Sequence, residues 1–412
     1  MVTVALAASL RTERHEYAVD LVLREVLGLE WKWTDGGGDV EVAPGGLLAG
    51  REVVTKPPMG EWKGWTLPYA EAGRMDVFAF AFWMVTRMEE WTDAGRDEHG
   101  RFMGSASWAA RAGMLEVPVV EVVVRAWAAA EGLPTPVPRQ SKWYATIDVD
   151  NALAYRGKPG WRVLAGFGRD VIERNWSRLK ERWAVNRGRM QDPFDTYEEL
   201  LDLHAAGGVE GFFFFLMADR GPYDEGLPHA SMELAEAIRR VAERTEVGIH
   251  PGYASHGRAE RVRTEMLRLQ GVLGREVEHA RQHYLLHDAR RAWPALVAAG
   301  VREDWSMGFA DQIGFRAGMA RPFPAYDLAA ECRLPLRVHP VLAMEATLAR
   351  YMQLPAGPET LERVWRCAQA AWDVGGDVVT IWHNETFAGR GEWQPWRQFY
   401  QTLIRERPAS LR

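Results

Sequence analysis

Two carboxylates follow an apolar segment near the middle of the chain. Asp148 and Asp150 come directly after the run 143–147, whose composition is typical of a β-strand. Side chains alternate along a strand, so residues two positions apart face the same side. Two like charges on one side are costly unless a cation or a shared proton compensates them. The pair therefore indicates a metal-dependent or acid/base site, and a turn rich in Asp and Asn is the simpler alternative.

Three further segments with strand-like composition end in polar side chains. One ends at His250, a later one carries Arg281 and His283, and the last ends at His383. In βα barrels the loops at the carboxyl ends of the strands form the active site, so we expect these side chains to converge. His nitrogen and Asp oxygen bind zinc-like divalent ions, which lower the pKa of water and polarise carbonyls. The residue types predict metal-assisted hydrolysis of an amide or ester.

The elements that must position these residues alternate between strand and helix after residue 141. A capping box of Thr196 and Glu199 predicts the start of one helix, and Ser231 predicts the start of another. The continuous apolar run 211–217 is typical of a strand that is covered on both faces. Repeated βα units imply a parallel sheet or barrel. We expect strands near 143–147, 211–217, 245–249, 280–286, 305–309 and 377–383, and helices near 197–204, 231–242, 288–299 and 357–374.

A proline-rich segment divides the chain into two predicted domains. Residues 134–140 contain three prolines in five positions, which makes the segment stiff and suits a linker. We therefore predict a smaller N-terminal α/β domain of unknown role at 1–133 and a barrel domain at 141–412. The first domain should contain an initial strand and helices near 16–29 and 77–90. Its glycine turn at 36–38 lacks the Lys-Ser/Thr of a phosphate loop.

Bulk composition excludes several classes of protein. The chain has 412 residues, is 47% hydrophobic and 26% charged, and carries a formal net charge of −6, which predicts no attraction to nucleic acid or anionic lipid. Two cysteines, Cys332 and Cys367, cannot form a disulfide framework or a cysteine zinc site. The apolar run 77–85 is too short to span a membrane, and residues 1–10 lack a basic leader. We expect a cytoplasmic protein without a membrane span, and the oligomeric state stays open.

The order of the landmarks in residues 141–400 resembles the polysaccharide deacetylase (NodB-homology) family, which uses a deformed βα barrel. The segments that carry the resemblance are 146–150, 211–217, 245–251, 281–284 and 381–384. Two earlier segments, 76–90 and 96–102, resemble the N-terminal domain of one bacterial subgroup of deacetylase-like proteins. The resemblance implies a hydrolase that removes an N-acetyl or similar acyl group from a carbohydrate, for example in surface polysaccharide synthesis.

The same resemblance implies residue roles. Asp148 would be the general base, held by Arg281, and His383 the general acid. Asp150 and His250 would bind a divalent metal, zinc being the expected ion. The family has a second metal-binding histidine four residues after the first, but Ala254 occupies that position. Three residues are candidates for the missing metal ligand: His283, His256 and Ser255. We predict that His283 is the ligand.

The chain departs from the family pattern in ways that keep other functions open. The family's adjacent Asp pair is separated here by Val149, so either carboxylate is a candidate metal ligand. The altered pair and the missing histidine also fit a non-catalytic glycan-binding protein on the same fold. An amidohydrolase acting on a non-sugar amide is a third alternative.

Four further residues are candidates for substrate binding. Arg316 lies between glycines, where backbone can approach a ligand, and its guanidinium suits a sugar carboxylate or phosphate. A structural salt bridge is the alternative for this arginine. Tyr253, Trp305 and Trp382 offer flat faces on which sugar rings can pack, although such aromatics also fill cores.

Overall fold

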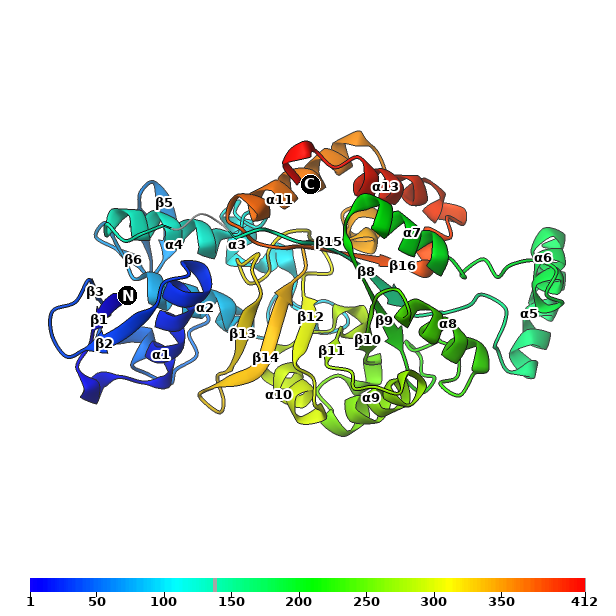
Figure 1. Ribbon diagram of the computed structural model, residues 1–412, viewed down its shortest axis with the longest axis horizontal. Helices are drawn as coiled ribbons and strands as arrows, with labels where there is room; N and C mark the ends of the chain where they lie inside the picture. Colours follow the sequence, from blue (N-terminus) through cyan, green and yellow to red (C-terminus); the bar gives the residue numbers. More distant parts are fainter. Residues whose placement is uncertain (136–138, 412) are drawn as a thin grey trace.

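The computed structural model describes residues 1–135 and 139–411. The middle of the predicted linker at 134–140 lies outside these residues, and the division into domains stays a prediction. Figure 1 shows the N-terminal region at one end of an elongated molecule and helices α5 and α6 at the other.

A nine-stranded sheet forms the centre of the molecule, in the order β13-β14-β12-β11-β10-β9-β8-β16-β15. Every neighbouring pair is parallel except β13 with β14. The strands are β8 (Trp143–Val149), β9 (Glu210–Leu216), β10 (Glu246–His250), β11 (His279–Ala280), β12 (Glu303–Met307), β13 (Phe323–Asp327), β14 (Cys332–Pro340), β15 (Ala343–Met344) and β16 (Val378–His383).

The sheet curls into a deformed barrel because one segment pairs with two distant strands. Strand β14 pairs with β12, and β15, which follows after two residues, pairs with β16. Between them the amide of Val341 donates to the carbonyl of Met307, and that of Leu342 to Val379. Counting β14 and β15 as one strand and leaving out β13 reduces nine strands to a ring of seven. This architecture agrees with the predicted barrel.

The phenylalanine-rich strand β9 explains how the barrel is filled. Phe212 and Phe214 point inward and join a small interior cluster with Trp305. Phe213 and Phe215 point outward into the main core beneath the helices. The alternation of side chains along one strand therefore serves two apolar layers, as the continuous apolar run predicts. The helices of this region are α7 (Tyr197–Gly207), α8 (Met232–Ala242), α9 (Ala259–Leu273), α10 (Ala289–Ala299), α11 (Pro358–Asp373), α12 (Asn384–Phe387) and α13 (Gln394–Arg405).

Several local predictions need correction. Thr196 does not cap α7, because its hydroxyl donates instead to the carbonyl of Asn384 at 3.2 Å. Ser231 does cap α8, accepting from the amide of Leu234. The strand expected at 280–286 is only the two-residue β11, followed by a short 3-10 turn. The sequence analysis missed the β13–β14 hairpin and the helices α5 and α6.

The N-terminal region contains a parallel sheet in the order β2-β1-β3 and a fully buried helix, α2. The predicted helix at 16–29 begins as α1 and continues as a π-helical segment over Leu21–Val26. The strands of the N-terminal region are β1 (Val2–Ala5), β2 (Trp31–Thr34), β3 (Val40–Glu41), β4 (Met59–Trp62), β5 (Trp65–Pro68), β6 (Ala70–Glu71) and β7 (Arg74–Met75). The helices of this region are α1 (Glu13–Asp20), α2 (Val77–Val85), α3 (Trp108–Arg111) and α4 (Val119–Ala130).

Within residues 1–135 and 139–411, no helix is both long enough and apolar enough to cross a bilayer.

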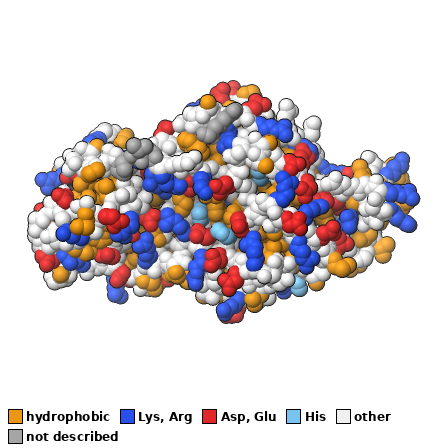
Figure 2. All heavy atoms as spheres, viewed as in Figure 1, with side chains coloured by type: hydrophobic (Ala, Val, Ile, Leu, Met, Phe, Trp, Pro, Cys, Tyr) orange, Lys and Arg blue, Asp and Glu red, His pale blue; other side chains and the backbone are white. Residues whose placement is uncertain are grey.

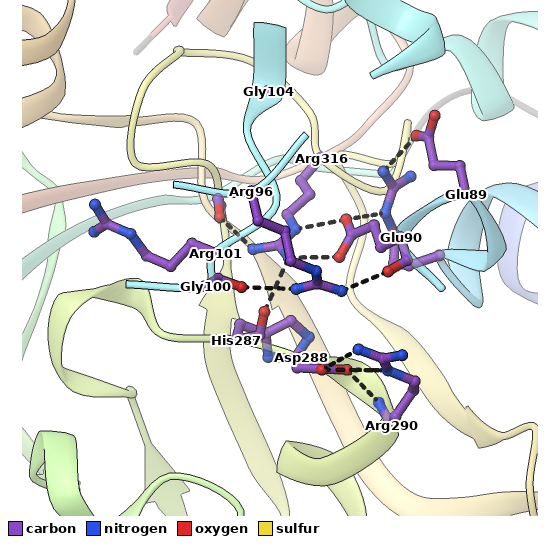
Figure 3. Close-up of polar contacts among 12 residues, drawn as sticks. Glu89, Glu90, Arg96, Gly100, Arg101, Gly104, His287, Asp288, Arg290 and Arg316 are labelled. Atoms are coloured by element: carbon purple, nitrogen blue, oxygen red, sulfur yellow. Dashed lines mark hydrogen bonds and ion pairs between the residues drawn. The ribbon is translucent and has the colours of Figure 1, made fainter. Parts of the chain in front are cut away.

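Buried polar contacts join the N-terminal region to the barrel. Arg14 of α1 pairs with Glu331 in the β13–β14 turn at 2.6 Å. Glu90, which follows α2, pairs with Arg316 at 2.6 Å, and both side chains are buried (Figure 3). Because a buried charge is tolerated only when it is paired, these contacts fix the two regions against each other.

Candidate metal centre

The carboxyl ends of the parallel strands surround a pocket of about 440 Å³. Of the predicted catalytic and metal-binding residues, all but Arg281 line it: Asp148, Asp150, His250, His283 and His383. Arg281 is fully buried beneath them and reaches Asp148. The convergence follows from the parallel sheet, in which all strands end on the same side.

Three side chains form a cluster that could hold a metal ion. One ligand atom each from Asp150, His250 and His283 lies within 4.8 Å of the other two. The Nε2 atoms of His250 and His283 lie 3.2 and 3.3 Å from the carboxylate of Asp150. The other two candidates for the third ligand lie outside this cluster. Ser255 donates to Glu265 at 2.5 Å, and His256 is half-enclosed near His287.

The hydrogen bonds of the two histidines fix which nitrogen faces the cluster. His250 Nδ1 lies 2.6 Å from the carbonyl oxygen of Arg281, which can only accept, so Nδ1 carries the proton. His283 Nδ1 lies 2.9 Å from the carboxylate of Asp224 and donates to it in the same way. Each Nε2 therefore faces the cluster and can bind an ion once it carries no proton, an arrangement usual for metal-binding histidines.

Among the residues that the structure describes, two atoms of the cluster are buried without a hydrogen bond. They are Asp150 Oδ1 and His250 Nε2. An unsatisfied buried polar atom costs about 1–3 kcal/mol, so each such atom needs an explanation. A cation between them would satisfy both atoms. One carboxylate and two imidazoles are also the donors that zinc-like ions prefer, and the residues present fit such an ion.

The pKa values of the cluster show strong mutual interaction. Burial opposes ionisation of Asp150, but the neighbouring His283, His250 and His383 together outweigh it and hold the pKa of the carboxyl well below its usual range. Burial also lowers the pKa of His283, but Asp150 and Asp224 raise it to about 9. Without a cation, protons on the imidazole supply the positive charge. Metal binding would displace such a proton.

Asp148 lies beside the cluster and is held by an arginine. Arg281 Nη1 lies 3.4 Å from Asp148 Oδ1, and Nη2 donates to the hydroxyl of Thr146 at 2.8 Å. The guanidinium also lies over the ring of Phe214 inside the barrel, 4.7 Å from its centroid. These contacts fix the direction in which the carboxylate of Asp148 faces the pocket.

His383, the last residue of β16, lies next to the cluster. Its Nδ1 lies 2.5 Å from Glu345, and its Nε2 points toward Asp150 at 3.7 Å. Burial lowers the pKa of His383, but Glu345 outweighs burial and holds it well above its usual value. Glu345 also accepts from the hydroxyl of Thr386 at 2.7 Å. The sequence analysis missed Glu345, since nothing near it in sequence marks it.

The predicted substrate-binding residues do not line the pocket. Arg316 is buried against Glu90 and the carbonyls of Gly308 and His287 (Figure 3). Trp305 lies inside the barrel, and Trp382 stacks on a tyrosine of α13. Their positions correct the expectation of sugar contacts and favour the packing and salt-bridge alternatives.

Tyr253 lies one layer behind the pocket wall. Its ring packs 4.3 Å from that of Tyr223, which does line the pocket. It therefore supports the wall without contacting the cavity.

The N-terminal region contributes one wall of the pocket. Arg101 donates to the carbonyl of Tyr284 and to the hydroxyl of Tyr351, both at 2.7 Å. Nearby, His99 lies 3.3 Å from the hydroxyl of Tyr253. The segment 96–102 therefore braces the aromatic rim. The rim consists of Tyr223, Tyr284, Tyr351 and Trp393.

Asp224 is expected to determine metal affinity although it does not reach the metal cluster directly. Asp224→Asn should weaken zinc binding about 10–100-fold, because the carboxylate orients His283 and increases its basicity. Isothermal titration with zinc measures the change. Asp219→Asn, a substitution at an exposed carboxylate nearby, is the matched control. An Asp224→Asn protein with wild-type affinity would remove Asp224 from this role.

Comparison with known proteins adds limited information. Residues 4–130 match a family of unknown function, DUF7033. No curated protein sequence matches the chain.

The solved structures that are similar to part of this chain include the following two. One, from Mycobacterium smegmatis, is provisionally described as a polysaccharide deacetylase; it is 16% identical, with a TM-score of 0.40, and the match covers 66% of this chain and 87% of that one. The other is a mutant of a CE4 family pseudoenzyme with restored enzymatic activity; it is 9% identical, with a TM-score of 0.28, and the match covers 65% and 63%. Both similarities are low.

Proposed function

We propose that this protein is a metal-dependent hydrolase that removes an N-acetyl or similar acyl group from a carbohydrate. The observation that supports it best is the convergence of Asp150, His250 and His283, whose facing buried atoms Asp150 Oδ1 and His250 Nε2 form no hydrogen bond among the described residues. Two further groups suited to proton transfer, Asp148 and His383, line the same pocket.

Asp150, His250 and His283 would hold the ion. When bound, a zinc-like ion polarises a carbonyl and lowers the pKa of water. Asp148 is placed to accept the proton of the attacking water, since it lines the pocket beside the ion's ligands. Arg281, which also donates to Thr146, keeps that carboxylate oriented.

His383 is suited to protonate the departing nitrogen. Its Nδ1 is occupied by Glu345, so the proton on Nε2 is the one available to the pocket. The high pKa of His383 keeps that proton in place until the leaving group develops basicity. Asp148 and His383 thus supply a base and an acid in one cavity.

The pocket has features suited to a sugar. Its volume of about 440 Å³ lies within the usual range for small-molecule sites. Tyr223, Tyr284 and Trp393 present aromatic faces at the rim, on which the apolar faces of sugar rings can pack. Arg350 and Glu385 add polar groups that can bind hydroxyls. These features support a carbohydrate substrate over an apolar amide.

Metal content is the decisive test. Mass spectrometry of protein purified without chelators should find about one zinc-like ion per chain. Asp150→Ala, His250→Ala and His283→Ala should each lose it, whereas His229→Ala, which changes an exposed histidine, should not. A wild-type protein that refuses added metal would contradict the hydrolase and favour a glycan-binding protein.

Release of acetate from N-acetylated sugars then tests the reaction. Metal-loaded wild-type protein should release acetate, and the metal-ligand variants should not. Hydrolysis of small non-sugar amides that free N-acetylated sugars fail to inhibit would instead favour the amidohydrolase.

A further inference from the structure

Helices α5 (Gly160–Ile172) and α6 (Trp176–Asn186) extend from the barrel as a hairpin (Figure 1). The hairpin and the residues to 190 expose an unusual amount of apolar side chain. Of the 14 large hydrophobic side chains exposed in the described residues, these seven lie there: Trp161, Leu164, Val171, Ile172, Trp176, Trp183 and Met190. Ile172 is 83% and Leu164 73% exposed.

The side of the hairpin where its helices meet is polar. Asp170 of α5 is buried there and pairs with Arg178 and Arg182 of α6. The guanidinium of Arg182 fills the space over Gly166, where a Cβ atom would collide with it. A helix in a soluble protein normally buries its apolar side and exposes its polar side. The hairpin instead buries a charged cluster and leaves seven large apolar side chains exposed, which indicates that its outer side meets a partly apolar environment.

The hairpin also concentrates positive charge. Residues 160–190 contain eight Lys or Arg and three Asp or Glu, a net charge of +5. Because the whole chain carries −6, the remainder carries −11. Four exposed cations of the segment form no ion pair among the described residues: Arg174, Lys180, Arg187 and Arg189. The net charge of the whole chain predicted no attraction to anionic lipid, but the segment 160–190 at one end of the molecule is basic.

Basic and apolar side chains are interleaved at this end. Arg187 and Arg189 lie over the ring of Trp183, 5.8 and 4.8 Å from its centroid. Figure 2 shows blue basic and orange hydrophobic side chains together at the end of the molecule that α5 and α6 form. Tryptophan beside Lys and Arg is the composition of segments that lie in the interface of a membrane.

We propose that the α5–α6 hairpin docks this protein on the surface of an anionic lipid bilayer. Trp161, Leu164, Ile172 and Trp176 enter the interfacial layer, and the unpaired cations contact anionic headgroups. At 13 and 11 residues the helices are too short to span a bilayer, so they lie on it. The positive charge of the hairpin is complementary to such a surface.

The hairpin is attached next to the pocket. Arg162 of α5 donates to the carbonyls of Glu225 and Gly226, both at 3.2 Å, and Glu225 lines the pocket. Tyr155 donates to Glu181 of α6 at 2.8 Å. Docking through the hairpin therefore brings the pocket rim near the bilayer. The docking surface does not depend on the proposed hydrolase activity.

Sedimentation with vesicles tests the proposal on the full chain. The protein should sediment with vesicles of phosphatidylcholine and phosphatidylglycerol, and much less with phosphatidylcholine alone. Binding should fall as salt rises. A charge variant, Arg174→Gln with Lys180→Gln and Arg187→Gln, should weaken binding at least about tenfold, because each cation near the surface contributes about 1 kcal/mol.

An apolar variant separates insertion from simple charge attraction. Trp161→Ser with Ile172→Ser and Trp176→Ser keeps every cation and should also weaken binding at least about tenfold. The matched control, Arg263→Gln with Leu267→Ser, changes an exposed cation and an exposed leucine of α9 and should bind as the wild type does. Circular dichroism of each variant checks that it is folded.

Two outcomes would overturn the proposal. One is wild-type protein that stays in solution with both kinds of vesicle. The other is a dimer in sedimentation velocity that the apolar variant dissociates, because a second copy of the chain would then cover the hairpin.

Discussion

Replacing Asp148 by Asn should lower kcat for deacylation about 10²–10⁴-fold while the metal stays bound. Asparagine keeps the shape of the side chain and can still accept from Arg281, but it cannot take a proton from water. Asp148 lies 3.9 Å from His250 Nε2 and outside the metal cluster, so its charge is not needed to hold the ion. Steady-state kinetics and metal content of the same preparation measure both parts.

Glu385 provides the comparison for this experiment. It is another carboxylate that lines the pocket. Its pKa is raised mainly by burial and, to a smaller extent, by the nearby Asp150. Glu385→Gln should retain most of kcat if Asp148 is the base. A large loss of kcat in Glu385→Gln, with kcat retained in Asp148→Asn, would instead identify Glu385 as the general base. An Asp148→Asn protein that loses its metal would make Asp148 a ligand, which the Asp-Val-Asp spacing left open.

The placement of the site residues could be predicted because strand ends determine it. In a parallel sheet every strand ends on the same side, so polar residues at strand ends must meet. His283 illustrates the reasoning, since it was preferred to His256 on the basis of its position near a strand end. The structure places it in the candidate metal cluster with Asp150 and His250.

Supporting residues were missed because local sequence does not mark them. Asp224 lies in an irregular segment after β9, and Glu345 follows the two-residue β15. Arg101 reaches the pocket from the N-terminal region across 183 residues of sequence. Such contacts depend on how loops and regions pack, and only the folded structure reveals them.

Arg316 shows how a valid principle led to the wrong location. The glycines beside it predict a close approach of the backbone to a ligand. The close approach is instead to the protein itself, because a Cβ at Gly314 would collide with the backbone of Leu115, and one at Gly318 with side chains of α2 and α4. The glycines let the chain pass the N-terminal region and deliver Arg316 to Glu90.

Glu90→Ala should lower the free energy of unfolding by about 3–5 kcal/mol, as expected when one partner of a buried ion pair is removed. Glu90 accepts from Arg316 at 2.6 Å and from Arg87 at 2.8 Å, and all three side chains are buried. Its loss leaves Arg316 buried without a counter-charge. Urea unfolding measures the change. Glu392→Ala, which breaks an exposed pair with Arg350, should cost less than about 1 kcal/mol.

Two further measurements show whether charge pairing causes the effect of Glu90→Ala. The double variant Glu90→Leu with Arg316→Met should be more stable than Glu90→Ala, because no unpaired charge remains at that contact. Burial opposes ionisation of Glu90, but Arg316 and Arg87 outweigh it and lower its pKa from 4.5 to about 2. A lowered pKa contributes stability above pH 4.5 that is lost as the pH falls toward 2. The difference between wild type and Glu90→Ala should therefore shrink over that range, and a constant difference would attribute the loss to packing alone.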